Sequence, residues 1–296
     1  MNNVLNSLSK AEAKDKIKEV KPWVRRFGRL GYMAKGLVYG MIGVLAALAA
    51  FGSGGGMTGT AGVLHSLAGM PFGEVALWII GIALIGYILW DFIKAIKDPE
   101  NDGTDAKGLI KRTGYSISGV IYTNLAFGAI KLASHTGYTG GDNSGKTISA
   151  KLMEHPFGIW LVGIVGAIIT GYGVFELYSG VKEKFMSKFK TYEMNDKERK
   201  IARLSGKLGL ISRGIVLSLV GFFFIRAAYT HNPDQSKGIG GALTALASQP
   251  FGQFILAIVA VGLILYGVYQ IIIGRYQHMN FGYDGENSIE VSEGTN

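Results

Sequence analysis

The sequence predicts an all-α membrane protein in which three similar units each contribute two transmembrane helices. Three observations support this fold class: six long apolar runs, a threefold internal repeat and a one-sided distribution of lysine and arginine. Hydrophobic residues make up 48% of the 296 positions and charged residues only 17%, well below the charge of a soluble domain. Glycine occupies 44 positions beside six prolines, so the glycine excess belongs to the apolar segments and not to a collagen-like or disordered chain.

Six apolar runs approach the length that crosses the bilayer as a helix, since about 30 Å of hydrocarbon needs roughly 20 helical residues. Several have uncharged cores of only 16 or 17 residues, so each alone could be a buried helix of a soluble protein, but six in series favour a membrane protein. The first run ends in alanines and looks like a signal peptide. Its polar leader is too long for one, and the same segment recurs later, so we expect an uncleaved helix. The six runs cover residues 32–51, 72–93, 115–133, 157–178, 210–229 and 251–273.

The internal repeat is the strongest signal. Pro-Phe-Gly recurs at 71–73, 156–158 and 250–252, and a glycine lies 40 to 42 residues upstream of each proline. Five residues after that glycine comes another one, and 20 residues after each proline comes a polar residue, with a tyrosine four residues before it. In repeat order these are Gly31, Gly114 and Gly209; Gly36, Gly119 and Gly214; Asp91, Glu176 and Gln270; Tyr87, Tyr172 and Tyr266.

The repeat unit is therefore a helix, a loop, Pro-Phe-Gly and a second helix. We expect Pro71, Pro156 and Pro250 in the first turn of the second helix, where a missing N–H costs nothing. Gly36, Gly119 and Gly214 are expected to let helices pack closely, and the matched tyrosines to anchor at the interface and pack helices. The predicted divisions are a basic leader 1–24, repeats 25–100, 101–195 and 196–278, and a polar tail 279–296.

In each repeat the second helix opens with Pro-Phe-Gly. The first helix of the three repeats opens, in order, with Arg29-Leu30-Gly31-Tyr32, Arg112-Thr113-Gly114-Tyr115 and Lys207-Leu208-Gly209-Leu210. In this pattern, over about residues 25–275, the chain resembles the bacterial membrane family catalogued as domain of unknown function 1206. The resemblance implies three transmembrane helix pairs and carries no assigned activity. The third repeat departs most, because Gln270 replaces an acid and Leu210 an aromatic residue, which argues against a symmetric three-carboxylate site.

Basic residues predict the orientation. Of the 30 lysines and arginines, 25 lie in the leader up to Lys35, in the linkers 91–113 and 177–213, and in the tail. Both termini should therefore be cytoplasmic, in the plasma (inner) membrane of a bacterium. The linkers, with Phe185 and Phe189 among lysines, suit adhesion to anionic inner-leaflet lipid, and no nucleic-acid binding is expected. Since each unit enters and leaves on the same side, the repeats are parallel and predict a pseudo-threefold bundle.

Polar residues at the cytoplasmic helix ends form the candidate site. Asp91, Glu176 and Gln270 should lie at one depth, together with the residues four positions after the repeat glycines, Lys35, Ser118 and Arg213. Ionisable groups avoid lipid, so we expect an inward polar ring closed by pairs such as Asp91 with Lys35 and Glu176 with Arg213. The ring is either a static brace or a gate or ion-coordination layer.

Other motifs give weaker indications of function. The segment 140–147 spells the phosphate-loop pattern but lies between membrane helices and not after a strand, so we expect a flexible turn there. The chain has no cysteine, and its five histidines lack helical ligand spacing, so neither a metal site nor a cofactor is expected. No catalytic motif appears, and an enzyme is not expected.

Two functions stay open. The first is a channel-like or transport protein for an ion or small solute, and the second is a non-conducting scaffold that binds anionic lipid or a protein partner. A polar cavity open to one side would favour transport, whereas an axis packed with large side chains would favour the scaffold. The oligomeric state stays open as well.

Overall fold

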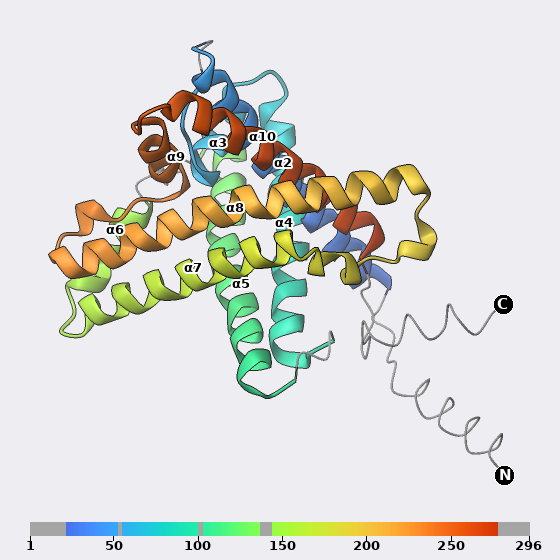
Figure 1. Ribbon diagram of the computed structural model, residues 1–296, viewed down its shortest axis with the longest axis horizontal. Coiled ribbons are helices and arrows are strands. Elements are labelled where there is room, and N and C mark those ends of the chain that lie inside the picture. Colours follow the sequence, from blue (N-terminus) through green and yellow to red (C-terminus); the bar gives the residue numbers. More distant parts are fainter. Residues whose placement is uncertain (1–21, 53–54, 100–102, 137–143, 278–296) are drawn as a thin grey trace.

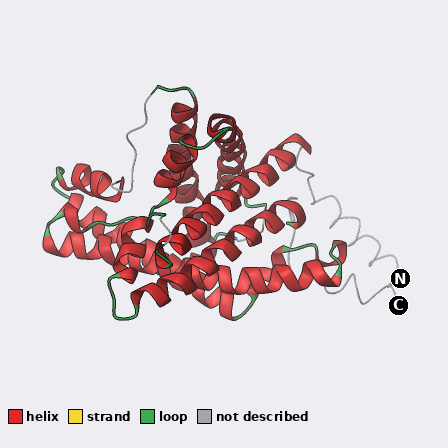
Figure 2. Ribbon diagram, turned by 90° about the horizontal axis from the view of Figure 1, so that it is seen from above, coloured by secondary structure: helices red, strands yellow, loops and turns green. Residues whose placement is uncertain are grey.

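The computed structural model describes residues 22–52, 55–99, 103–136 and 144–277, and these are helices joined by short loops (Figures 1 and 2). Among them, six helices are long and apolar enough to cross a membrane, and no strand occurs, which confirms the all-α six-span prediction. The predicted leader, apart from residues 22–24, and the predicted tail lie outside the described residues. The six helices are α2 (Pro22–Ala50), α4 (Gly73–Lys97), α5 (Ala106–Ala133), α7 (Gly158–Val181), α8 (Asp196–Thr230) and α10 (Gly252–Tyr276).

Each repeat also contains a short helix before its Pro-Phe-Gly. These are α3 (Thr60–Ala68), α6 (Ser144–Met153) and α9 (Ile239–Ala247), so the prediction of a plain loop in this part of the unit is wrong. The flexible turn expected at 140–147 is also wrong in its described part, because residues 144–147 form the first turn of α6. Lys146 of that turn makes an ion pair of 2.7 Å with Asp234 of the short 3-10 helix η3 (Pro233–Gln235).

Pro-Phe-Gly is a tight turn between the short helix and the following long one. The Gly73 N–H donates to the Met70 carbonyl at 2.9 Å, and α4 begins only at Gly73. Pro71 therefore lies before the helix and not in its first turn as predicted; its fixed φ suits the second position of a β-turn. Phe72 follows with a φ of +62°. A Cβ on Gly73 would lie 1.9 Å from a carbonyl oxygen of α3, and in the other repeats the equivalent distances are 1.6 and 2.1 Å, so only glycine fits.

The long helices pack mainly between repeats: α2 on α10, α4 on α5, and α7 on α8. One of the three predicted packing glycines lies at each of these contacts. A Cβ on Gly36 would lie 2.6 Å from a carbonyl oxygen of α10, and one on Gly214 would lie 2.7 Å from a carbonyl oxygen of α7. A Cβ on Gly119 would lie 3.2 Å from a ring carbon of Phe92 in α4. The missing side chains let the backbones approach, as expected where lipid provides no hydrophobic drive.

Within repeats the packing is unequal. α2 packs on α4 and α8 packs on α10, but α5 and α7 make no comparable contact in the described residues. The helices thus follow the cyclic order α2, α4, α5, α7, α8, α10 of a pseudo-threefold ring that is open in the second repeat. Figure 1 shows the reason: the α4–α5 pair stands upright, and the α7–α8 pair lies across it.

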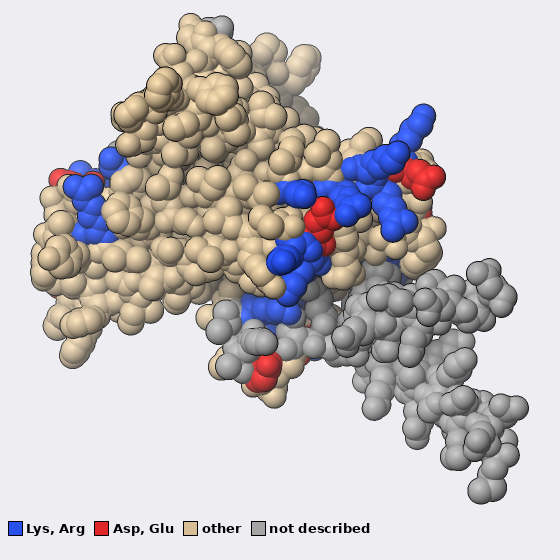
Figure 3. Space-filling model, in the orientation of Figure 1, with Lys and Arg blue, Asp and Glu red and all other residues tan. Residues whose placement is uncertain are grey.

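The corner between α7 and α8 contains the 3-10 helices η1 (Lys184–Lys188) and η2 (Thr191–Glu193). Phe185 and Phe189 are buried there, with ring centroids 5.3 and 5.8 Å from that of Tyr269 in α10. These two rings belong to the core and are not available for the adhesion to lipid that the linker sequence suggested. The basic side chains do reach the surface, and they gather over this corner and the first half of α8 (Figure 3).

Candidate functional site

The charged residues of the candidate ring are buried where the long helices converge. We call Lys35, Asp91, Lys94, Ser118, Glu176, Arg213 and Gln270 the buried polar centre; all six long helices contribute to it. Apart from half-buried Ser118, its members are at most 6% exposed. Three of these side chains are cationic and two are carboxylates, so opposite charges do not balance within the centre.

Glu176 and Arg213 face each other across the α7–α8 contact. The Arg213 guanidinium makes a buried ion pair with the Glu176 carboxylate, as the sequence hypothesis suggested. The guanidinium carbon also lies 5.1 Å from the ring centroid of Tyr39 and 4.9 Å from that of Tyr266. Aromatic faces attract cations, so the rings stabilise the arginine away from water.

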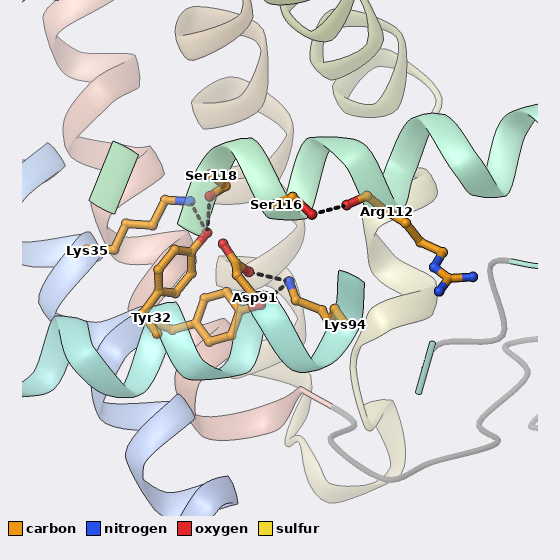
Figure 4. A network of polar contacts seen from close by, with 8 residues as sticks. Tyr32, Lys35, Asp91, Lys94, Arg112, Ser116 and Ser118 are labelled. Carbon is orange, nitrogen blue, oxygen red and sulfur yellow. Dashed lines mark hydrogen bonds and ion pairs between the residues drawn. The ribbon is translucent and has the colours of Figure 1, made fainter. Parts of the chain in front are cut away.

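Asp91 does not pair with Lys35 as proposed. Its Oδ1 lies 2.8 Å from the Nζ of Lys94, one turn further along α4 (Figure 4). The Lys94 ammonium also donates to the Tyr32 hydroxyl at 3.1 Å and lies 4.1 Å from the Tyr115 ring centroid. Sequence reasoning missed Lys94, which counted only as an orienting charge; its position three residues after Asp91 was the available signal.

Lys35 is held by neutral groups. Its Nζ donates to the Tyr87 hydroxyl at 2.9 Å, and that hydroxyl lies 3.2 Å from the Ser118 Oγ. Figure 4 labels Lys35 and Ser118, whose dashed lines meet at this hydroxyl. The ring centroids of Tyr87 and Tyr122 lie 4.7 and 5.0 Å from the ammonium. Among the described residues no carboxylate lies within ion-pair distance of Lys35. The centre thus holds a buried amino group without a direct counter-ion.

The residues 20 positions after the repeat prolines each have a buried side-chain oxygen that accepts no hydrogen bond among the described residues. Asp91 Oδ2, Glu176 Oε2 and Gln270 Oε1 are buried, and none accepts a hydrogen bond from the part of the chain that the structure describes. The Gln270 amide itself donates to the Tyr266 hydroxyl. Buried acceptors are normally satisfied, so three at equivalent positions are an unusual concentration of unused acceptor capacity.

The repeat tyrosines line this centre. Tyr87 and Tyr266 are at most 4% exposed and pack edge-on against Tyr32 and Tyr39, at centroid distances of 5.1 and 4.9 Å. Their expected role as interfacial anchors is therefore wrong, whereas their role in helix packing is what the structure shows. Tyr172, the third of the set, is 45% exposed.

Comparison with known proteins settles the family. The family model described as "Domain of Unknown Function (DUF1206)" matches residues 30–98, 113–183 and 208–277, one match within each predicted repeat. The chain belongs to the DUF1206 family. It is also similar to "Uncharacterized protein YxxB" of Bacillus subtilis (strain 168), with 43% identity over 263 residues, which cover 89% of this chain and 94% of that protein. No solved structure matches.

In this DUF1206 protein, tyrosine rings pack against the cationic side chains of the buried polar centre. Two cavities in the described part of the chain lie elsewhere, one beside Glu74 and His135 between α4 and α5, and one beside Ser212 between α8 and α10. His135 and Glu74 approach to 3.4 Å at the surface, but no group of three metal-ligating side chains occurs among the described residues.

Proposed function

We propose that this protein transports a small solute across the bacterial plasma membrane by alternating access at the buried polar centre, with both termini in the cytoplasm. The observation that carries the proposal is the burial of three cationic and two carboxylate side chains where all six long helices meet. Charge inside a membrane protein is expensive, and a well-packed apolar core would hold such a bundle at least as firmly. Retained charge is therefore best explained by a solute that it binds.

Packing at the centre supports a carrier over an open channel. Tyrosine rings pack against the charged side chains between the helices: two rings lie against Lys35 and three against Arg213. A solute reaches such a site only if helices move. Transporters built from repeats achieve this by moving one group of helices against another around a fixed site.

The charge balance favours an anionic solute. Lys35 has no carboxylate within ion-pair distance among the described residues, and an anion would provide the missing counter-ion. The unsatisfied oxygens of Asp91, Glu176 and Gln270 would in turn accept hydrogen bonds from O–H or N–H groups on the same solute. The proposed substrate class is therefore a small anion that carries such a donor. Neither a metal ion, nor a cofactor, nor an enzymatic reaction enters the proposal.

A non-conducting scaffold is the second candidate, and the packed axis favours it. In that case the centre is a brace, and the basic surface over the α7–α8 corner binds anionic lipid or an acidic protein (Figure 3). The two functions differ in one measurable way, since only the carrier moves solute.

Uptake by proteoliposomes tests the proposal. The purified protein is reconstituted and assayed with bicarbonate, hydrogen phosphate and lactate, with chloride and nitrate as anions that lack donors, and with sodium and potassium. We expect uptake of at least one donor-bearing anion above that of empty liposomes, reduced in the variants Glu176→Gln and Asp91→Asn. Absence of uptake by folded protein for the whole panel would refute this substrate class and favour the scaffold, which binding to anionic against neutral vesicles then tests.

A further inference from the structure

The second repeat leaves open a contact that the other two repeats make. In the first repeat α2 and α4 touch through two glycines: a Cβ on Gly31 would lie 2.4 Å from the Tyr87 amide nitrogen, and one on Gly86 would lie 2.3 Å from the Phe27 carbonyl oxygen. In the third repeat a Cβ on Gly209 would lie 2.6 Å from the Cα of a tyrosine in α10. Glycine is needed at these places because a backbone occupies the space of a side chain.

The equivalent glycines of the second repeat have empty space around them. Gly114 of α5 stands where Gly31 stands in the first repeat, and Gly171 of α7 stands where Gly86 stands. A Cβ on either of them would meet no atom within 4 Å. Glycine inside a helix lowers helix stability by about 1 kcal/mol relative to alanine. Because no neighbouring atom approaches these two glycines, they have no packing role in this conformation.

The aromatic residues beside these glycines show the same difference. Tyr87 and Trp90 of α4 are at most 4% exposed in the closed first repeat. Their equivalents on α7, Tyr172 and Phe175, are 45% and 48% exposed. We call Gly114 of α5, together with Gly171, Tyr172 and Phe175 of α7, the α5–α7 seam. It carries the residues of a helix contact but does not form one.

We infer that α7 closes onto α5 in a second conformation, with the backbone at Tyr172 seated on Gly114 as Tyr87 is seated on Gly31. The occupant of the seam is thus the chain's own helix. Two tight pairs, α4 with α5 and α7 with α8, would move against each other as units, because each pair makes one of the three most extensive helix contacts in the fold, together with α2 on α10. The threefold ring would then be complete.

Closure would act on the buried polar centre. Glu176 lies four residues after Tyr172 on α7 and moves with it, together with its partner Arg213 on α8. Ser118 lies four residues after Gly114 on α5 and holds the hydroxyl that binds Lys35. Bringing the helices together moves the two halves of the centre relative to each other. The seam is therefore the gate of the proposed carrier, and this role, unlike closure itself, rests on the proposed function.

Disulfide trapping tests closure. Because the chain has no native cysteine, only the introduced cysteines can form a disulfide. The double variant Gly114→Cys/Gly171→Cys places both new side chains in open space, so it should fold as the wild type does. A disulfide needs Cα atoms within about 7 Å, which only the closed conformation provides. The matched control is Ser149→Cys/Ser236→Cys, since those hydroxyl oxygens lie 2.6 Å apart in the structure.

Both pairs are oxidised in liposomes and examined by mass spectrometry and on non-reducing gels. We expect a disulfide within one chain for both pairs. Failure of the Gly114/Gly171 pair to react while the serine-derived pair reacts would overturn closure. A bond between two chains would also overturn it, because the seam would then receive a second copy.

Uptake by the cross-linked protein tests the gate. We expect oxidation of the Gly114→Cys/Gly171→Cys protein to stop uptake and reduction to restore it, whereas unchanged uptake after complete cross-linking would overturn the gating role. If the wild type itself takes up nothing, the proposed function fails, but cross-linking still decides whether the seam closes.

Discussion

Alanine at equivalent glycines of two repeats should have opposite effects on stability. A Cβ added at Gly31 would lie 2.4 to 2.7 Å from the amide nitrogen, Cβ and Cα of Tyr87, whereas ordinary carbon contacts lie at about 3.5–4.0 Å. α2 must therefore move away from α4 by about 1 Å, and such overpacking costs about 1–3 kcal/mol. A Cβ added at Gly114 would touch nothing within 4 Å.

The comparison isolates packing, because both changes gain the same helix propensity of about 1 kcal/mol. We expect Gly31→Ala to lower the free energy of unfolding by about 0–2 kcal/mol and Gly114→Ala to raise it by about 1 kcal/mol. Unfolding in mixed micelles, driven by sodium dodecyl sulfate and followed by far-ultraviolet circular dichroism, measures both. Gly209→Ala should behave like Gly31→Ala. Equal destabilisation by Gly31→Ala and Gly114→Ala would refute the open seam.

Three further predictions concern other parts of the chain. Glu176→Gln should lower the free energy of unfolding by about 3–5 kcal/mol, because it leaves Arg213 buried without its counter-ion, and the double variant Glu176→Leu/Arg213→Met should regain most of that; the same micelle titration measures both. Gly73→Ala should destabilise more than Gly31→Ala, since its Cβ would lie 1.9 Å from a rigid carbonyl oxygen, and a thermal melt of the two variants side by side checks the order. The hydrogen bond from Arg203 lowers the pKa of the Glu183 carboxyl, so this contact contributes above the ordinary carboxyl pKa and is lost as the pH falls through the lowered one. The protection factors for hydrogen exchange at residues 182–195, which correct for the pH dependence of intrinsic exchange, should therefore fall in acid, and Glu183→Gln should abolish that dependence.

Long-range features of the fold follow from the sequence because they depend on length, composition and repetition. Apolar runs of bilayer length predict the six helices, and matched spacing predicts three units. The repeat glycines predict close packing, and Gly36 and Gly214 do lie against a neighbouring backbone. Glu176 and Arg213 were expected at one depth with opposite charge, which is the information needed to bring them together.

The details of the candidate site that the sequence did not predict depend on which face of its helix a residue occupies. Lys94 follows an apolar helix and looks like an orienting charge, but its turn of α4 directs it at Asp91. Tyrosines often anchor helices at the membrane interface, but Tyr87 and Tyr266 lie well inside α4 and α10, and the structure directs both rings inward. The open seam is beyond any sequence argument, since the glycine of the second repeat, Gly114, is the same residue as its closed counterparts. Only its surroundings differ.

The most direct test of the transport centre is the initial rate of anion uptake by Lys35→Met in proteoliposomes. Lys146→Met is the matched control, because Lys146 lies on the short helix α6, is 52% exposed and pairs with Asp234, which is not part of the centre. With equal amounts of folded protein, we expect uptake to fall by about tenfold or more in Lys35→Met, since losing a buried charge contact costs at least about 2 kcal/mol, and to stay unchanged in Lys146→Met. Wild-type uptake by a folded Lys35→Met protein would contradict the assignment of the buried polar centre as the transport site.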